Sequence, residues 1–408
     1  MSVQILQPGA AEFALERGKL PAAEVPGLYV HIPFCVHKCG YCDFYSITRQ
    51  SAQRMEGFVE LMLREADGWA GWGGGGRVLP RTVFFGGGTP TLLPLEAMRR
   101  LILGLRERFD FSRCVEWTVE ANPATVTQEY CRMLGESGVT RISMGAQSFR
   151  PAELRLLERH HDPEDVPKGL ELARAAGISR LNIDLIYAIP GQTMAGWMEN
   201  LETAIGLGTE HLSCYGLTYE ANTPLTVRRR LGQVKPAEES LELEMMRQTR
   251  KRLEAAGLPA YEISNFAKPG CECGHNLLYW TGESYVGLGP SAASHVSGWR
   301  WKNRPHLGQW ESCIEADQLA AAEVEQLSPR RRAGELAMLL LRLSRGIEFS
   351  EFFERTGFDA KIMFSDAIGR LGREGLIVAG KDSIRLGEAG LAVADGVAAE
   401  FLAACAES

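Results

Sequence analysis

The 408-residue chain lacks several features that mark familiar protein classes. No apolar run reaches the ~18–20 residues that a membrane-spanning helix needs. The stretch from Met1 to Pro26 has no basic start followed by a long apolar core, so it does not indicate a secretory signal. A net charge of −7 argues against an extended phosphate-binding surface, which requires excess Lys and Arg. We therefore expect a cytoplasmic protein with no nucleic-acid partner and at most peripheral contact with a membrane.

Strand-like and helix-like stretches alternate about six times along the chain. The predicted strands are Gly27–Pro33, Thr82–Phe85, Val115–Glu120, Val139–Gly145, Ile178–Tyr187 and His211–Thr218. The predicted helices are Ser51–Trp69, Pro94–Phe109, Thr127–Ser137, Pro151–Glu158, Glu164–Ala176, Ala195–Leu207 and Ala237–Ala256. Such alternation implies parallel strands joined by right-handed crossovers. The expected fold class is α/β, an open (β/α)6-type partial TIM barrel with its working residues at the carboxyl ends of the strands.

The pattern changes near Pro329 to three helices and a hairpin, which predicts a small winged-helix-like α+β domain at the C-terminus. Residues 330–408 contain 11 Lys or Arg against 12 Asp or Glu. A DNA-binding wing should be basic, so we expect a packing or lid role. The predicted organisation is an N-terminal extension (1–26), the barrel (27–260), a connecting segment (261–328) and the C-terminal domain (329–408).

Three of the ten cysteines, Cys35, Cys39 and Cys42, fall within eight residues. A reducing compartment argues against a disulfide framework, so the cluster predicts a metal site. Thiolates are soft ligands suited to iron–sulfur clusters, and these spacings let one loop hold three corners of a cubane. The open corner can take the amino and carboxylate groups of S-adenosylmethionine (SAM). The alternative is a zinc knuckle, which needs a fourth Cys or His ligand nearby at suitable spacing; His37 lies inside the loop.

The motif CxxxCxxC with Tyr41 before its last cysteine resembles the radical SAM superfamily. The segments YVHIPFC, FFGGGTP, VEANP, GAQSF and NIDLIYAIPG are similar to the oxygen-independent coproporphyrinogen III oxidase group, which includes the HemN and HemW proteins. The similarity covers about Gly27 to Trp301. It implies a 4Fe–4S cluster on the three cysteines and SAM as a second cofactor. The positions that match the group's cofactor contacts are Tyr29, Tyr41, Gly87, Gly88, Thr89, Glu120, Gln147, Arg159 and Asp184.

The residue types at these positions suit the same ligand. Glycines after a strand let the backbone approach a ligand closely, although an ordinary tight turn would also use them. Glu120 at a strand end is a natural partner for ribose hydroxyls, and the Arg159 guanidinium suits a carboxylate. For each charged residue taken alone, a surface cap or an ion pair is the plainer interpretation.

Two features distinguish the branches of this group. Asp43 and Phe44 follow Cys42, whereas the oxidase has a fourth cysteine at the position of Phe44. The segment HNLLYW, beginning at His275, matches the HNxxYW pattern of the haem-chaperone branch. His can ligate haem iron, and Tyr and Trp offer flat apolar surface, so His275 is a candidate haem contact. The alternative is a packed loop in which His275 caps a backbone group.

The resemblance therefore implies a haem chaperone with haem as cargo, haem-accepting apoproteins (respiratory ones among them) as recipients, and an electron donor for the cluster. The alternative function is an enzyme of porphyrin metabolism, either a coproporphyrinogen III oxidase or another HemN-like radical SAM catalyst. The sequence leaves the catalytic status open and identifies no catalytic residue beyond the cofactor site. Cys271 and Cys273 lie just before His275 and are expected to be free thiols.

Overall fold

The computed structural model describes residues 15–72 and 75–405. Most of the predicted N-terminal extension, residues 1–14, lies outside the described residues. Six consecutive parallel strands form the centre of the sheet: β1 (Glu24–Ile32), β4 (Arg77–Gly87), β5 (Glu116–Ala121), β6 (Arg141–Gln147), β7 (Arg180–Tyr187) and β8 (His211–Gly216). The predicted α/β partial barrel is confirmed.

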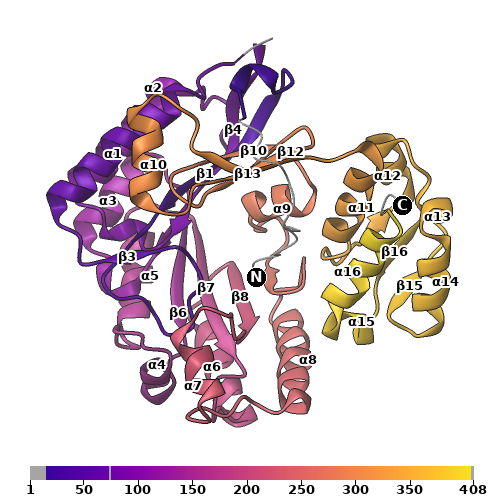
Figure 1. The fold of residues 1–408 in the computed structure, drawn as a ribbon. Helices are drawn as coiled ribbons and strands as arrows, with labels where there is room; N and C mark the ends of the chain where they lie inside the picture. The colour runs from indigo at the N-terminus through magenta and orange to yellow at the C-terminus, as the bar shows by residue number, and fades with distance from the viewer. Residues whose placement is uncertain (1–14, 73–74, 406–408) are drawn as a thin grey trace.

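Helices follow these strands and cover the outer side of the sheet (Figure 1). They are α1 (Ala52–Asp67), α2 (Leu95–Arg108), α3 (Gln128–Glu136), α4 (Pro151–Leu156), α5 (Asp165–Ala175), α6 (Met194–Gly206), α7 (Pro224–Arg230) and α8 (Glu239–Ala255). Several begin at a hydroxyl cap: the Ser51 side chain accepts from the Arg54 N–H, and the Thr127 side chain from the Tyr130 N–H. These local capping signals determine where the helices begin. Each helix then carries the chain back to the next strand.

The segment 261–328, predicted as a connection, extends the sheet on both sides. Its short strand β9 (Asn265–Ala267) pairs antiparallel with β8, and β10 (Tyr285–Leu288) pairs parallel with β1. Three antiparallel strands continue from β10, and α10 (Leu307–Glu315) packs near α1. These strands are β11 (Ala293–Val296), β12 (Trp299–Asn303) and β13 (Ala321–Gln326). The described residues thereby form an eleven-stranded sheet.

The C-terminal domain has its own hydrophobic core, which includes Leu340, Phe352, Phe364 and Phe401. Its helices are α11 (Pro329–Leu340), α12 (Phe349–Thr356), α13 (Ala360–Met363), α14 (Ser365–Arg373), α15 (Glu388–Ala392) and α16 (Ala394–Ala403). A three-stranded sheet of β14 (Ile347–Glu348), β16 (Ser383–Leu386) and β15 (Ile377–Ala379) completes it, in that order. The predicted hairpin is β15 and β16.

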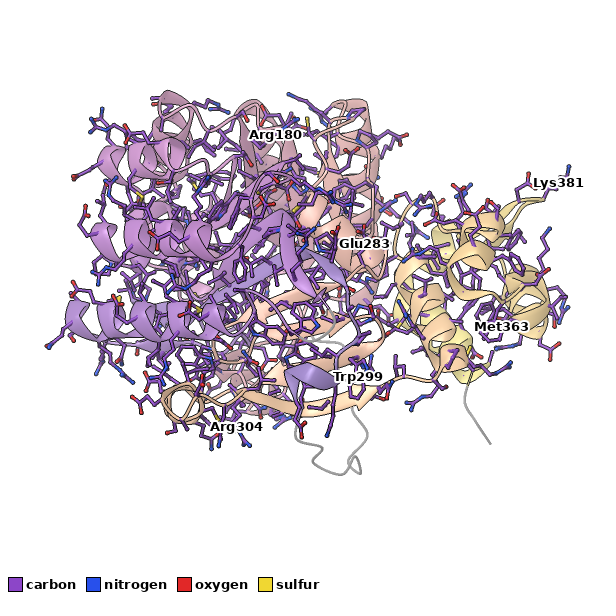
Figure 2. All side chains as sticks on the ribbon, turned by 90° about the horizontal axis from the view of Figure 1, so that it is seen from above. Arg180, Glu283, Trp299, Arg304, Met363 and Lys381 are labelled. Carbon is purple, nitrogen blue, oxygen red and sulfur yellow. The ribbon has the colours of Figure 1, made fainter. Side chains whose placement is uncertain are left out.

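One short helix, α9 (Gly274–Trp280), lies between the sheet and the C-terminal domain (Figure 1). Its Leu278 is fully buried, and Leu277 and Trp280 pack against the core of the C-terminal domain. Figure 2, viewed from above, places that domain, with Met363 and Lys381, beside the sheet that carries Trp299. In the described ranges we find no helix with the length and apolarity to cross a membrane.

Candidate functional site

The three clustered cysteines lie on one loop at the carboxyl end of β1. The chain leaves β1 through β2 (Phe34–Cys35) and returns through β3 (Ile47–Thr48), which pairs parallel with β2. Inside this loop the Cys42 N–H donates to the Cys39 carbonyl at 3.1 Å. The pairing and the turn bring all three thiols to the same end of the barrel, and each cysteine is half-buried.

The thiols have polar neighbours from other strands. Thr89 Oγ1 lies 3.7 Å from Cys35 Sγ, and Arg159 Nη1 lies 3.7 Å from Cys39 Sγ. Burial raises the pKa of the Cys42 thiol to about 11, so that thiol keeps its proton at neutral pH unless a metal displaces it. No group of three or more His, Cys, Asp or Glu side chains in the described ranges is arranged to hold a metal ion. In a 4Fe–4S cubane each cysteine binds a different iron, so its thiolates stay apart.

The glycines that end β4 allow a close approach to the cysteine loop. Gly87 has φ +103°, and a Cβ there would lie 2.5 Å from the His31 ring. A Cβ on Gly88 would lie 2.7 Å from the Phe34 carbonyl oxygen, which accepts the Thr89 N–H at 2.7 Å. A side chain would therefore push the strand away from the start of the cysteine loop. The glycines are needed by the fold itself, beside any contact with a ligand.

Two carboxyl groups, Glu120 on β5 and Asp184 on β7, lie at the same end of the barrel. Glu120 Oε2 accepts the Gly87 N–H at 3.1 Å. Burial, followed by the negative charge of Asp184, raises the pKa of Glu120 to about 8. Burial also raises the pKa of Asp184, which accepts hydrogen bonds from Asn182 at 2.7 Å and Ser143 at 3.3 Å. A cation placed here would favour ionisation of both groups.

The backbone near Arg159 is in an unusual conformation. Gln147, at the end of β6, has φ +66°, and Glu158 has φ +58°, although neither is glycine. Left-handed non-glycine residues are costly and concentrate at functional sites. The Arg159 guanidinium donates to the Gly145 carbonyl, while its buried Nε has no hydrogen-bond partner among the described residues. A fixed guanidinium with an unused donor is a ready anion partner.

Two tyrosines line the same region. The Tyr29 hydroxyl lies 3.1 Å from His31 Nδ1, and its ring stacks on Phe84 with centroids 6.3 Å apart. Burial raises the pKa of Tyr41. The positive charge of Arg159 lowers that pKa, and the charge of Cys39 raises it. The predicted site residues other than His275 thus lie on the cysteine loop or toward the carboxyl ends of the strands, with Tyr29 deeper in the barrel, where it shares the Phe84 ring with His275.

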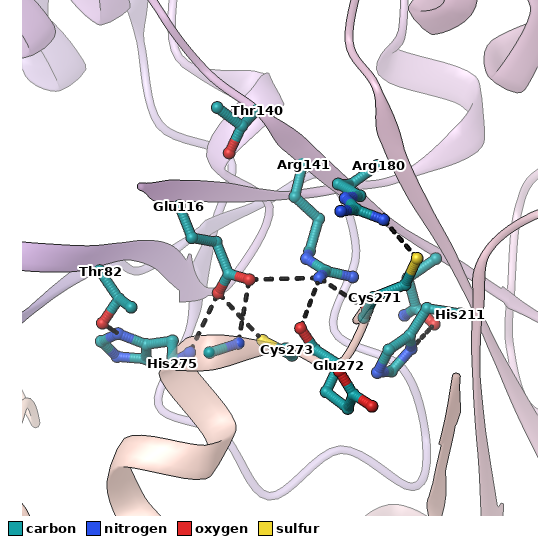
Figure 3. A network of polar contacts seen from close by, with 12 residues as sticks. Thr82, Glu116, Thr140, Arg141, Arg180, His211, Cys271, Glu272, Cys273 and His275 are labelled. Atoms are coloured by element: carbon teal, nitrogen blue, oxygen red, sulfur yellow. Dashed lines mark hydrogen bonds and ion pairs between the residues drawn. The ribbon is translucent and has the colours of Figure 1, made fainter. Parts of the chain in front are cut away.

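His275 lies at the opposite end of the barrel, near the amino ends of the strands (Figure 3). Its Nδ1 is 2.9 Å from Thr82 Oγ1, its Nε2 is 2.9 Å from the Tyr279 hydroxyl, and the ring stacks on Phe84 at 5.4 Å. The residue is 0 % exposed, and burial lowers its pKa to about 3. Both ring nitrogens are therefore used inside the protein. Haem ligation by His275 stays a prediction, and in this conformation it would require α9 to move.

The start of α9 is held by a buried ion pair inside the barrel. Glu116 accepts the N–H groups of Gly274 at 2.9 Å and His275 at 3.0 Å, and it pairs with Arg141 Nη2 at 3.2 Å. Arg141 also donates to the carbonyl groups of Cys271 and Glu272, at 3.0 and 2.9 Å. This network closes the amino end of the barrel.

Cys271 and Cys273 belong to the same network and are free thiols. Arg180 contacts Cys271 Sγ, and Cys273 Sγ lies 3.4 Å from Glu116 Oε1. Burial raises the pKa of the Cys273 thiol to about 12. Both cysteines therefore sit among charged side chains rather than beside the candidate cofactors.

The sequence analysis missed the polar interior of the barrel. Glu116, Thr118 and Glu120 alternate along β5, and Asn182 and Asp184 do so along β7. Strands of a parallel sheet covered by helices are ordinarily apolar throughout. Polar residues at every second position are the signal that would have predicted an inward polar face.

Two family models match the chain. The family model of the radical SAM superfamily matches residues 29–204, and that of the HemN C-terminal domain matches residues 327–393. Among solved structures, coproporphyrinogen III oxidase (HemN) from Escherichia coli superposes with a TM-score of 0.81 at 24 % identity, covering 93 % of this chain and 90 % of that one. This likeness shows the fold.

Curated relatives are more similar in sequence. The heme chaperone HemW of Lactococcus lactis is 32 % identical over 84 % of this chain and 88 % of its own. HemW of Bacillus subtilis is 33 % identical over 86 % and 92 %, and HemW of Escherichia coli is 38 % identical over 66 % and 70 %. The superfamily implies a 4Fe–4S cluster and SAM as cofactors. The chain belongs to the HemW family of the radical SAM superfamily.

Proposed function

We propose that Cys35, Cys39 and Cys42 hold a 4Fe–4S cluster that binds SAM at its open iron, and that the protein carries haem to apoproteins as a chaperone. The observation that carries the first part is the meeting of three half-buried thiols with Arg159 at the carboxyl end of the barrel. The second part is supported by the relatives named heme chaperones, which match this chain over most of their length.

The residues present fit both cofactors. The donor set of three thiols on one loop suits an iron–sulfur cluster with one iron left open. Burial raises the pKa of Glu120 and Asp184, and the ammonium and sulfonium groups of SAM, placed beside them, would favour their ionised forms. The unused Nε of Arg159 suits the SAM carboxylate.

Each side chain then has a definite task. The bound and reduced cluster supplies an electron that can cleave a carbon–sulfur bond of SAM. Arg159, fixed to the Gly145 carbonyl, orients the ligand's carboxylate beside Cys39. Glu120, held by the Gly87 N–H, is positioned for the ribose hydroxyls, and Asn182 and Ser143 keep Asp184 in place. Tyr29, Tyr41, Thr89 and Gln147 complete the wall of this pocket.

The cluster assignment is tested by replacing Cys35, Cys39 and Cys42 together with Ala and reconstituting the protein with iron and sulfide without oxygen. We expect loss of iron and of the 4Fe–4S absorption, because the thiolates are the only protein ligands proposed. A variant with Cys114 and Cys313 changed to Ala, both half-buried elsewhere, is the control and should load normally. A normal 4Fe–4S spectrum in the triple variant would falsify the assignment.

The chaperone function is tested by loading the protein with haem and mixing it with an apo-haem protein. Transfer of the haem absorption to the acceptor is the expected result. A parallel anaerobic assay with coproporphyrinogen III, SAM and reductant examines the enzymatic alternative. Phe44, where the oxidase has its fourth cysteine, argues against turnover. Clear formation of protoporphyrinogen IX without haem transfer would replace the chaperone with the enzyme.

A further inference from the structure

Three groups suit haem: an axial ligand for the iron, of which histidine nitrogen is a common one, apolar surface for the porphyrin, and cations for the two propionates. This inference rests on the proposed chaperone function. All eight histidines of the chain lie in the described ranges, so each can be tested as an iron ligand.

Most of the histidines have no nitrogen to offer. Four have both ring nitrogens engaged in hydrogen bonds inside the protein: His31, His211, His275 and His295. Both ring nitrogens of His161 lack a hydrogen-bond partner among the described residues, but the residue is only 5 % exposed, so neither nitrogen is accessible to haem. His37, His160 and His306 are the histidines that remain on the surface.

Only two of the surface histidines lie together. The rings of His37, on the cysteine loop, and His160, just after Arg159, have centroids 4.5 Å apart. They line an open hollow of about 480 Å³, whose other lining residues are Arg155, Glu158 and Arg159. Binding clefts for small molecules usually have volumes of about 300–1,000 Å³. His306 lies elsewhere, against the ring of Tyr45.

Glu158 organises this hollow. Its carboxylate lies 3.3 Å from His37 Nε2 and 3.9 Å from Arg228 Nη1, and a Cβ on Gly40 would lie 3.1 Å from it. When one ring nitrogen of a histidine donates its N–H to a carboxylate, the proton is held on that nitrogen. The other ring nitrogen then keeps its lone pair and is a better metal ligand. His37 Nδ1 has no hydrogen-bond partner in the described part of the chain.

Apolar side chains are exposed on two segments that border the hollow: the cysteine loop, which carries His37, and α7, whose Arg228 lies 3.9 Å from Glu158. On the cysteine loop, Val36 is 65 % exposed and Phe44 is 61 % exposed. On α7, tied to the loop by the bond from the Leu225 N–H to the Gly40 carbonyl, Val227 and Leu231 are also exposed. The guanidinium groups of Arg155 and Arg228 stand beside this apolar surface. On a chain of net charge −7, such local cations beside exposed apolar groups suit an amphipathic anion.

We infer that haem binds in this hollow, with His37 or His160 as the iron ligand and Arg155 and Arg228 as partners of the propionates. Haem would then lie against the same loop that carries the proposed cluster. Arg159 lines the hollow and contacts Cys39 Sγ, so one side chain borders both sites.

The experiment is a titration of ferric haem into the cluster-loaded protein and into three variants. His37→Ala/His160→Ala should weaken binding at least tenfold and shift the Soret band, because the axial ligand sets the electronic state of the iron. His306→Ala, another surface histidine, should bind like the wild type. His275→Ala should lower stability but keep haem affinity. Circular dichroism and the cluster absorption verify that each variant is folded and loaded.

Each outcome is decisive. Unchanged affinity and an unchanged Soret band in His37→Ala/His160→Ala would overturn the inference while leaving the chaperone function standing. The inference would also be overturned if a folded His275→Ala protein lost haem while His37→Ala/His160→Ala kept it. The haem site would then lie at the amino end of the barrel. Absence of haem binding by the wild type would instead overturn the proposed function. Restoration of the double variant's spectrum by added imidazole would support ligation directly.

Discussion

Removal of the Glu116 carboxylate should destabilise the protein strongly and detach α9 from the barrel. In Glu116→Ala the Arg141 guanidinium, whose side chain is 3 % exposed, loses its counter-charge. The N–H groups of Gly274 and His275 lose their acceptor as well. Breaking a buried ion pair from one side costs about 3–5 kcal/mol, and each orphaned donor about 1–3 kcal/mol where water cannot reach it. Because water will enter part of the cavity, we expect a total of about 4 kcal/mol.

A double-mutant cycle separates the ion pair from ordinary loss of packing. Arg141→Met alone leaves Glu116 charged and buried, so it should cost about 3 kcal/mol. Glu116→Ala/Arg141→Met removes both charges and should cost less than the sum of the single changes by about 2–3 kcal/mol. Urea unfolding followed by tryptophan fluorescence and circular dichroism gives the free energies if the slopes stay constant. A cost below about 1 kcal/mol for Glu116→Ala, or strict additivity, would refute this reasoning.

Further predictions concern the cofactor end. Because burial raises the pKa of Glu120 from 4.5 to about 8, the folded state retains a proton that the unfolded chain releases, so stability should fall as pH rises from about 4.5 to about 8. Glu120→Gln removes this titration. Above pH 8 the free energy of unfolding of the cofactor-free variant should exceed that of the wild type by up to about 5 kcal/mol. Equal pH dependence of the two proteins in thermal melts would contradict this prediction. In Gly87→Ala the new Cβ would meet the His31 ring, so cluster occupancy should fall and the loss of stability should exceed that of Gly191→Ala. At Gly191 a Cβ meets no neighbouring atom, and only about 1–2 kcal/mol of backbone strain is expected. Equal effects of the two substitutions would contradict the packing argument. His275→Ala should cost about 3 kcal/mol and leave the cluster absorption unchanged, and a lost cluster would show that the two ends are coupled.

The sequence was most informative where local signals decide the structure. The six parallel strands were predicted within a few residues, since each is an apolar run followed by a turn and an amphipathic helix. Helix α12 (Phe349–Thr356) belongs to the C-terminal region where the sequence predicts helices. Glu120 was predicted from its place at a strand end, whereas Asp184, which lies inside β7, was predicted from the resemblance to the coproporphyrinogen oxidase group.

Such local signals do not predict contacts between residues that are far apart in the sequence. Strands β10 and β11 have four residues each and include Gly, Ser and His, so they carry no strand pattern of their own. Their pairing is imposed by the open edge of β1, more than 250 residues earlier in the chain, where Val30 pairs with Leu288. The burial of His275 depends on Thr82 and Glu116, which are 193 and 159 residues away. A sequence motif shows such a histidine but not its surroundings.

The position of α9 late in the chain affects the order in which the parts of the barrel can fold during synthesis. Domains fold from the N-terminal side during synthesis, as their segments emerge. The cysteine loop, Gly87, Glu120, Arg159 and Asp184 have all emerged before residue 190, so the cofactor end can assemble early. Arg141 must wait 130 further residues for the carbonyl of Cys271. The nascent chain therefore leaves the charged interior of the barrel open at its amino end until α9 has been synthesised, and only then can β10 pair with β1.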